Sequence, residues 1–203
     1  NYTLFLTSDH GGVHVPSYLA SRRIPSGYFD DKAFTAALKE YVSDQFGASE
    51  AILNVSNGQI FFDYDVLQNK EIVAKELEES IAHFAMQYEQ INMTFTRSQL
   101  EGATFTTGIA SLIDHGFHQK RSGDVAFVLD PSVISYSPTG STHGSGQNYD
   151  THAPLIFYGH GIKQGSSAER TEIVDIAPTI SVLLGIPFPN GSTGSPLTMV
   201  LAE

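Results

Sequence analysis

The sequence of 203 residues contains no cysteine, and its basic residues are few. Without cysteine, disulfides and thiolate zinc sites are excluded, so a bound metal must use histidine and carboxylate ligands. Lys and Arg number 11 against 22 Asp and Glu, which gives a formal charge of −11. This excess of acids disfavours nucleic acid and anionic membranes as partners over most of the surface.

Long hydrophobic runs are also missing. No apolar run approaches the ~20 residues that a membrane span needs, and no basic segment followed by an apolar one indicates a signal peptide. The apolar residues, 41% of the total, still suffice for a globular domain. Because the chain opens on Asn1, a few residues before a strand, we expect it to be a piece of a longer protein.

Apolar periodicity and turn signals predict a mixed α/β fold. A helix is expected from Asp30 or Asp31 to Phe46, with acids at its start and Gly47 at its end. Asn57-Gly58 between two β-rich runs predicts a hairpin with a type I′ turn. The remaining predicted elements are buried strands at 4–6 and 154–162, strands at 91–100 and 124–130, and helices at 70–90, 106–116 and 171–187, the last capped by Asp175.

Asp9 and His10 directly follow the first predicted strand, in the stretch TSDHGG. Enzymes of the α/β class place their chemistry at the carboxyl ends of strands, and a carboxylate beside an imidazole is an ordinary pair of zinc ligands. Gly11 and Gly12 are expected to let the chain turn away after the pair. The plainer alternative is a polar strand end that only makes hydrogen bonds.

His143 and His152 lie in a long polar loop, 131–153, between two predicted strands. His152 stands just before the strand at 154–162. It can therefore approach Asp9 and His10 only if that strand runs antiparallel to the first one, or if the loop folds back. The spacing of the residues leaves both arrangements open.

Three blocks of the sequence, TSDHGG, GSTHGSGQNYDTHAPLIFYGHGIKQG and TEIVDIAPTISVLLGIPFPNGSTG, resemble the C-terminal half of the alkaline phosphatase superfamily. The stretch GVHVPSYLASRRIPSGYFD is similar as well. Within that superfamily, the blocks look most like bacterial phosphatases and type I phosphodiesterases that use a threonine nucleophile. It implies an alkaline-phosphatase-like α/β fold, with a mixed central sheet and flanking helices, truncated at the N-terminal side. Residues 1–203 would be the C-terminal portion of one domain, with an inserted hairpin-and-helix region at about 48–130.

The resemblance also implies two zinc ions at the carboxyl edge of the sheet. Asp9 and His10 would bind one ion, and His152 would bind the other. His143 and Asp150 would lie near the site, where Asp150 is a candidate for orienting His152. Two ions about 4 Å apart would clamp the attacking and leaving oxygens of an in-line displacement.

The nucleophilic threonine of such enzymes, their first aspartate and their Asp-x-x-x-His element would all precede Asn1. Asp114 and His118 have the Asp-x-x-x-His spacing. They follow the Asp9-His10 pair in another segment, however, and we treat the match as coincidence. We therefore expect no catalytic residue in this chain, no turnover by the 203 residues alone, and weak zinc binding at most.

The resemblance thus predicts that the longer protein hydrolyses phosphate monoesters with zinc, through a covalent phosphothreonine. Phosphodiesterase or nucleotide pyrophosphatase activity on the same metals is the alternative, and a non-catalytic structural module is an alternative of another class. The partner would be a small phosphate ester, in the periplasm or outside the cell. Because the first strand belongs inside a sheet, we also expect the chain to self-associate through an exposed sheet edge.

Overall fold

A computed structural model describes residues 1–202 and confirms the predicted α/β class, with helices and both parallel and antiparallel strand pairs. It divides into two compact units, which are described separately. Unit 1 combines Asn1–Asp9 with the chain from Ala153 onward, and unit 2 is formed by His10–His152. Within the described residues no helix is long and apolar enough to cross a membrane.

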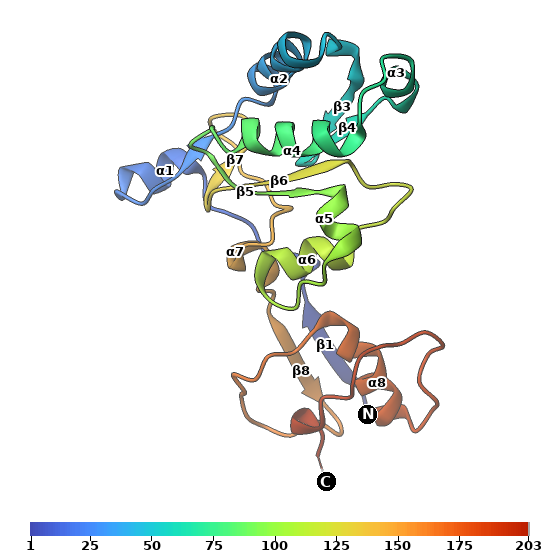
Figure 1. The fold of residues 1–203 in the computed structure, drawn as a ribbon. Helices are drawn as coiled ribbons and strands as arrows, with labels where there is room; N and C mark the ends of the chain where they lie inside the picture. The colour runs from blue at the N-terminus through green and yellow to red at the C-terminus, as the bar shows by residue number, and fades with distance from the viewer. Residues whose placement is uncertain (203) are drawn as a thin grey trace. The chain divides into compact units, whose positions relative to one another are not determined.

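Unit 1 contains a ladder of two antiparallel strands, β1 (Thr3–Thr7) and β8 (Leu155–Gly159), which lie side by side in Figure 1. Thr7 pairs with Leu155 at one end of the ladder and Thr3 pairs with Gly159 at the other. The antiparallel arrangement is therefore the one that the chain adopts. The other elements of the unit are η2 (Ile173–Asp175), α8 (Ile176–Leu184) and η3 (Thr198–Val200).

The expectation that both strands of this ladder are buried is wrong for the described chain. The side chains of Leu4, Leu6 and Tyr158 are 53%, 51% and 63% exposed. The pairing places Leu4 opposite Tyr158 and Leu6 opposite Ile156, so these four apolar side chains share one face. Strands this apolar need a wider sheet or a second layer to bury both faces, and a two-stranded ladder supplies neither.

The carboxylate of Asp175 does not cap α8 as predicted, although the residue stands at the N-cap position. It accepts hydrogen bonds from the backbone N–H of Glu172 at 2.8 Å and of Ser195 at 2.9 Å. Thr179 of α8 then accepts a bond from the Leu197 N–H at 2.8 Å. These contacts hold the C-terminal tail on the helix, which a local capping pattern does not reveal.

Unit 2 is built on a four-stranded antiparallel sheet in the order β3 (Ile52–Ser56), β4 (Gln59–Phe62), β6 (Val125–Leu129) and β5 (Ile91–Thr96). The type I′ hairpin predicted between β3 and β4 is confirmed, because Asn57 and Gly58 have φ angles of 52° and 69°. Smaller elements complete the unit: α1 (Pro16–Ser21), η1 (Ser49–Ala51), α7 (Asn148–Thr151), and a parallel pair of β2 (Gly27–Tyr28) with β7 (Val133–Ile134).

Helix α2 (Asp31–Phe46) begins and ends where its sequence signals predict. The Asp30 carboxylate accepts hydrogen bonds from two N–H groups of the first turn, and Gly47 ends the helix with a φ of 64°. With α4 (Ala74–Ala85), α2 covers one face of the sheet (Figure 1). Their buried side chains form the main core with those of the strands, including Phe34, Leu38, Leu77, Ile81, Ile60, Val125 and Phe127.

The helix predicted at 70–90 is shorter than expected. Asp63 caps a separate helix, α3 (Tyr64–Asn69), and the chain then turns through Glu71, whose φ is 55°. A residue with a left-handed backbone interrupts a helix, so α4 begins only at Ala74.

The strand predicted at 91–100 ends at Thr96, where a capping box with Gln99 starts α5 (Arg97–Gly102). Together with α6 (Gly108–Gly116), α5 lies on the face of the sheet opposite α4 (Figure 1). A second apolar cluster forms there around Phe95, Leu100 and Val128. In β6, Val125 and Phe127 face the main core whereas Val128 faces this cluster, which is the period-2 alternation of a strand covered on both sides.

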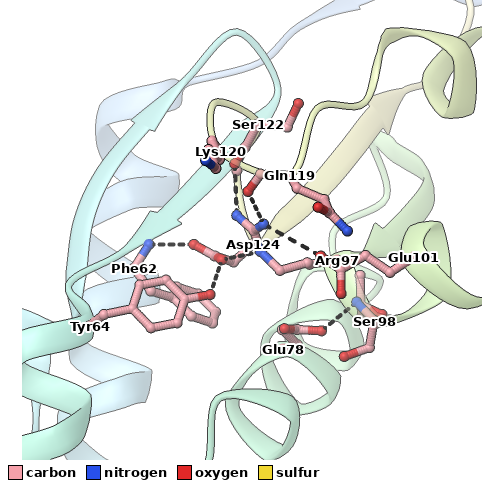
Figure 2. A network of polar contacts seen from close by, with 12 residues as sticks. Phe62, Tyr64, Glu78, Arg97, Ser98, Glu101, Gln119, Lys120, Ser122 and Asp124 are labelled. Atoms are coloured by element: carbon pink, nitrogen blue, oxygen red, sulfur yellow. Dashed lines mark hydrogen bonds and ion pairs between the residues drawn. The ribbon is translucent and has the colours of Figure 1, made fainter.

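A buried polar network centred on Asp124 ties β4, β6 and the start of α5 together (Figure 2). Asp124 is only 2% exposed. Its carboxylate accepts hydrogen bonds from the Phe62 N–H at 2.7 Å, the Tyr64 hydroxyl at 2.6 Å and the Arg97 Nε–H at 2.7 Å. Arg97 also donates to the backbone carbonyls of Gln119 and Ser122. Neutral donors and acceptors therefore complete the hydrogen bonding of the buried Asp124–Arg97 ion pair.

The network also shifts two pKa values. Burial, together with the hydrogen bond to Asp124 and its negative charge, raises the pKa of Tyr64 to about 12. Burial alone would lower the pKa of Arg97, but the hydrogen bond and charge of Asp124 outweigh it and raise that pKa. Tyr64 is consequently neutral and Arg97 cationic in the folded protein at neutral pH.

Candidate functional site

The segment that begins at His10 is bound to the loop 141–151 within unit 2. The Gly11 N–H donates to the Asp150 carbonyl at 2.8 Å. Two residues further on, the Val13 carbonyl accepts a hydrogen bond from the Ser141 hydroxyl. These bonds join positions separated by more than 125 residues in sequence, so the loop holds the segment that carries His10.

Gly11 is required here for a reason that differs from the predicted turn. Neither Gly11 nor Gly12 has a positive φ, so no left-handed turn follows the Asp9-His10 pair. A Cβ atom on Gly11 would instead lie 1.9 Å from the Tyr149 carbonyl oxygen. Only glycine lets the backbone approach this closely, and Gly12 has no such constraint because its Cβ would lie 3.8 Å from the nearest atom.

His10 is half-buried, and two of its contacts bear on the orientation of its ring. Its Nδ1 lies 2.6 Å from the Gly11 carbonyl oxygen. A carbonyl can only accept, so Nδ1 carries the proton and Nε2 carries the lone pair in the neutral imidazole. The ring also stacks on His143, with 3.5 Å between centroids and 16° between planes. The structure thus places His143, an exposed loop residue, directly against His10.

Asp150 is buried, with 6% of its surface exposed. Its Oδ2 accepts bonds from the Ser145 N–H at 2.8 Å and the Ser145 hydroxyl at 2.6 Å. Its Oδ1 has no hydrogen-bond partner within residues 1–202. The sequence offered Asp150 as a group that orients His152, but the carboxylate holds Ser145 instead and shapes the loop that carries His143.

Asp9 and His152 stand at the two points where the chain passes between the units. Asp9 follows β1 and is exposed. His152 ends α7, its N–H donates to the Asn148 carbonyl at 2.9 Å, and it is exposed. In the part of the chain that the structure covers, no three His, Cys, Asp or Glu side chains are grouped closely enough to bind one metal ion.

Asp114 and His118, which share the spacing of a metal motif, have local partners. The Asp114 carboxylate accepts the Phe105 N–H at 3.3 Å, and His118 Nδ1 accepts the Lys120 N–H at 3.1 Å. Both side chains therefore make local hydrogen bonds around α6.

Comparison with known proteins identifies relatives along the whole chain. A family model described as type I phosphodiesterase / nucleotide pyrophosphatase matches residues 1–154. Alkaline phosphatase PafA of Elizabethkingia meningoseptica is 33% identical over 207 residues, which cover 100% of this chain and 37% of that protein. A protein of Myroides odoratus named calcium-transporting ATPase is 34% identical, with coverage of 100% and 37%.

A solved structure agrees with these matches. The crystal structure of wild-type alkaline phosphatase PafA has a TM-score of 0.89 and 31% identity, over 99% of this chain and 38% of that chain. The 203 residues therefore span about 37% of the length of the curated relatives. The chain belongs to the type I phosphodiesterase / nucleotide pyrophosphatase family, within the alkaline phosphatase superfamily that its motifs predicted.

Proposed function

We propose that these residues form part of a zinc-dependent phosphatase that hydrolyses phosphate monoesters. Relatives named alkaline phosphatase match the chain from end to end, which favours monoesters as substrates. The geometric observation that carries the proposal is the hydrogen bond from His10 Nδ1 to the Gly11 carbonyl at 2.6 Å. Histidines that ligate metals donate their second ring N–H in this way, which orients the other nitrogen toward the ion.

The proposed ligands are Asp9 and His10 for one zinc ion and His152 for the other. Their donor atoms, a carboxylate oxygen and imidazole nitrogens, are those that zinc prefers in a chain without cysteine. Zinc bound there would lower the pKa of the attacking hydroxyl and stabilise the leaving alkoxide. The part played by this chain is to present the His10 imidazole in one tautomer, with the ring held flat against His143.

The attacking hydroxyl is proposed to be a threonine outside the 203 residues, which forms a covalent phosphothreonine. The coverage of about 37% of each relative supports this view, because it leaves most of a phosphatase outside the present sequence. Residues 1–203 would then be the C-terminal portion of one domain with an insertion at about 48–130, and would not turn over alone. The relationship also supports a periplasmic or secreted location.

Phosphodiesterase or nucleotide pyrophosphatase activity is the second candidate, and the description of the matching family model favours it. The decisive assay uses the longer protein with p-nitrophenyl phosphate and bis(p-nitrophenyl) phosphate, each with and without a chelator. Faster hydrolysis of the monoester, lost on chelation, is expected. Faster hydrolysis of the diester would reverse the ranking. No hydrolysis of either ester, or activity that survives chelation, would favour a non-catalytic module or another chemistry.

The ligand assignment predicts how the 203-residue chain responds to zinc. Calorimetric titration is expected to show weak binding that falls about tenfold or more in Asp9→Ala and in His152→Ala, because each change removes one of few ligands. His83→Ala is the matched control, since His83 is an exposed histidine of α4. Equal zinc affinity in all four proteins would show that the ligands are assigned wrongly.

We also propose that the chain self-associates through the β1–β8 ladder, whose apolar face includes Leu4, Leu6 and Tyr158. Exposed strand edges and apolar patches promote pairing with other chains. Sedimentation velocity is expected to show a concentration-dependent shift to larger species, reduced by Leu6→Lys. Leu53→Lys, at an exposed position of β3, should leave that shift unchanged. A monomer at all concentrations would contradict the proposal.

A further inference from the structure

Asparagine followed by glycine occurs twice in the chain, and the structure places the two pairs in different surroundings. Asn57-Gly58 forms the turn between β3 and β4 in unit 2, and Asn190-Gly191 lies in unit 1, between α8 and η3. Both asparagines are exposed. Exposure alone therefore does not distinguish the two pairs, and the difference lies in how the backbone of each glycine is held.

The backbone of Asn57-Gly58 is held by the neighbouring strand β6. The Gly58 carbonyl accepts a hydrogen bond from the Phe127 N–H at 2.7 Å. A Cβ atom on Gly58 would lie 2.8 Å from the Phe127 carbonyl oxygen, so the strand also approaches this glycine closely. Gly58 therefore cannot move relative to Asn57 unless the bond to β6 breaks and the end of the hairpin opens.

Asn190 and Gly191 occupy the two central positions of an exposed turn. The Ser192 N–H donates to the Pro189 carbonyl at 3.1 Å, which closes the turn. Neither Asn190 nor Gly191 makes a hydrogen bond within residues 1–202, and a Cβ atom on Gly191 would meet no atom within 4 Å. The φ of Gly191 is 79°, an angle that favours glycine at this position of a turn. The turn therefore leaves this asparagine–glycine pair free of the constraint that holds the other pair.

We propose that Asn190 is a site of spontaneous covalent modification, at which the asparagine cyclises onto the next residue and loses ammonia. The Gly191 backbone nitrogen gives up its proton and bonds to the carbonyl carbon of the Asn190 side chain. The bond from that carbon to the amide nitrogen breaks, and the leaving group takes up a proton and departs as ammonia. The product is a succinimide. Gly191 assists the attack, because it has no side chain to obstruct its nitrogen and its backbone adopts more conformations than that of other residues.

Water completes the reaction and is the only other reagent. It adds to either carbonyl of the succinimide and opens the ring to aspartate or to isoaspartate, which adds one negative charge to the formal −11. Both ends of the loop are anchored, because the Ile186 N–H donates to the Ser181 carbonyl at 3.0 Å and the Ser195 N–H donates to the Asp175 carboxylate at 2.9 Å. The change should therefore be confined to the turn between these anchors.

The test follows both asparagines while the folded 203-residue chain is incubated in mildly alkaline buffer. Digestion with pepsin in acid stops the reaction, and chromatography with mass spectrometry measures aspartyl and isoaspartyl peptides from each position. Asn190 should convert about tenfold or more faster than Asn57, because reaction at Asn57 requires the hairpin to open first. Incubation in guanidinium chloride, which unfolds the chain, should remove most of this difference.

One variant and an internal control complete the experiment. Asn190→Gln keeps a side-chain amide but needs a larger ring to cyclise, so conversion at that position should be lost. Asn54, an exposed residue of β3, should stay intact in every sample, because the branched side chain of Val55 obstructs attack by the next nitrogen. Equal rates at Asn57 and Asn190 in the folded chain, a difference that persists unchanged after unfolding, or formation of aspartate without isoaspartate would overturn the proposal.

Discussion

Replacement of Asp124 by alanine is expected to lower the free energy of unfolding by about 3–5 kcal/mol, the usual cost of removing one partner of a buried ion pair. The change deletes the acceptor of three hydrogen bonds at 2.6–2.7 Å, from Phe62, Tyr64 and Arg97. It also removes the nearer of two anionic partners of the Arg97 guanidinium, whose side chain is only 16% exposed, and leaves it with Glu101 at 3.8 Å. Urea denaturation followed by circular dichroism measures the loss.

Tyr64→Phe is the matched control for this prediction, because it removes one bond to the same carboxylate and no charge. A loss of about 1 kcal/mol is expected at neutral pH. The pKa of Tyr64 is raised from 10 to about 12 in the folded protein. The stability that this shift contributes is therefore fully present below pH 10 and is lost as the pH rises from 10 through about 12. The free energy of unfolding of Tyr64→Phe should therefore fall less between pH 10 and pH 12 than that of the parent protein.

Two outcomes would contradict this account of the network. One is an Asp124→Ala protein within about 1 kcal/mol of the parent protein, which would mean that water replaces the carboxylate without penalty. The other is a Tyr64→Phe protein that is destabilised as much as Asp124→Ala. That result would assign the stability to the tyrosine and not to the ion pair.

Substitution of alanine for Gly11 is expected to reduce zinc affinity by about 10- to 100-fold, the range found when groups that support metal ligands are disturbed. The added Cβ would lie 1.9 Å from the Tyr149 carbonyl oxygen, so the backbone must separate there. This separation breaks the Gly11–Asp150 hydrogen bond and moves the carbonyl that orients His10. Calorimetric zinc titration gives the change in affinity.

Gly12→Ala provides the control, because its Cβ would lie 3.8 Å from the nearest atom and cause no collision. Hydrogen exchange of the amide at position 11 is a second measurement that does not depend on zinc. Exchange should accelerate in Gly11→Ala and remain slow in Gly12→Ala, because only the first change breaks the bond to Asp150. If the two variants behave alike in both experiments, the close approach at Gly11 does not support the site.

Features that depend on short stretches of sequence were predictable. The caps of α2 at Asp30 and Gly47 and the type I′ turn at Asn57-Gly58 agree with the structure. Each depends on hydrogen bonds or backbone angles within a few residues, and the identity of those residues is sufficient to specify them. Errors occurred where several local signals compete, as at Asp63, which starts the unpredicted helix α3, and at Thr96, which starts α5 inside a stretch predicted as a strand.

The sequence by itself determined the α/β class, the family and the identity of the candidate ligands Asp9, His10 and His152, because these depend on residue types, order and motifs. Only the tertiary structure decided that His143 stacks on His10, that Gly11 is needed for close approach to Tyr149, and that one oxygen of Asp150 faces no partner. The first two of these features join positions more than 125 residues apart. No local periodicity encodes such contacts, because they form only when the whole of unit 2 packs and its backbone paths meet.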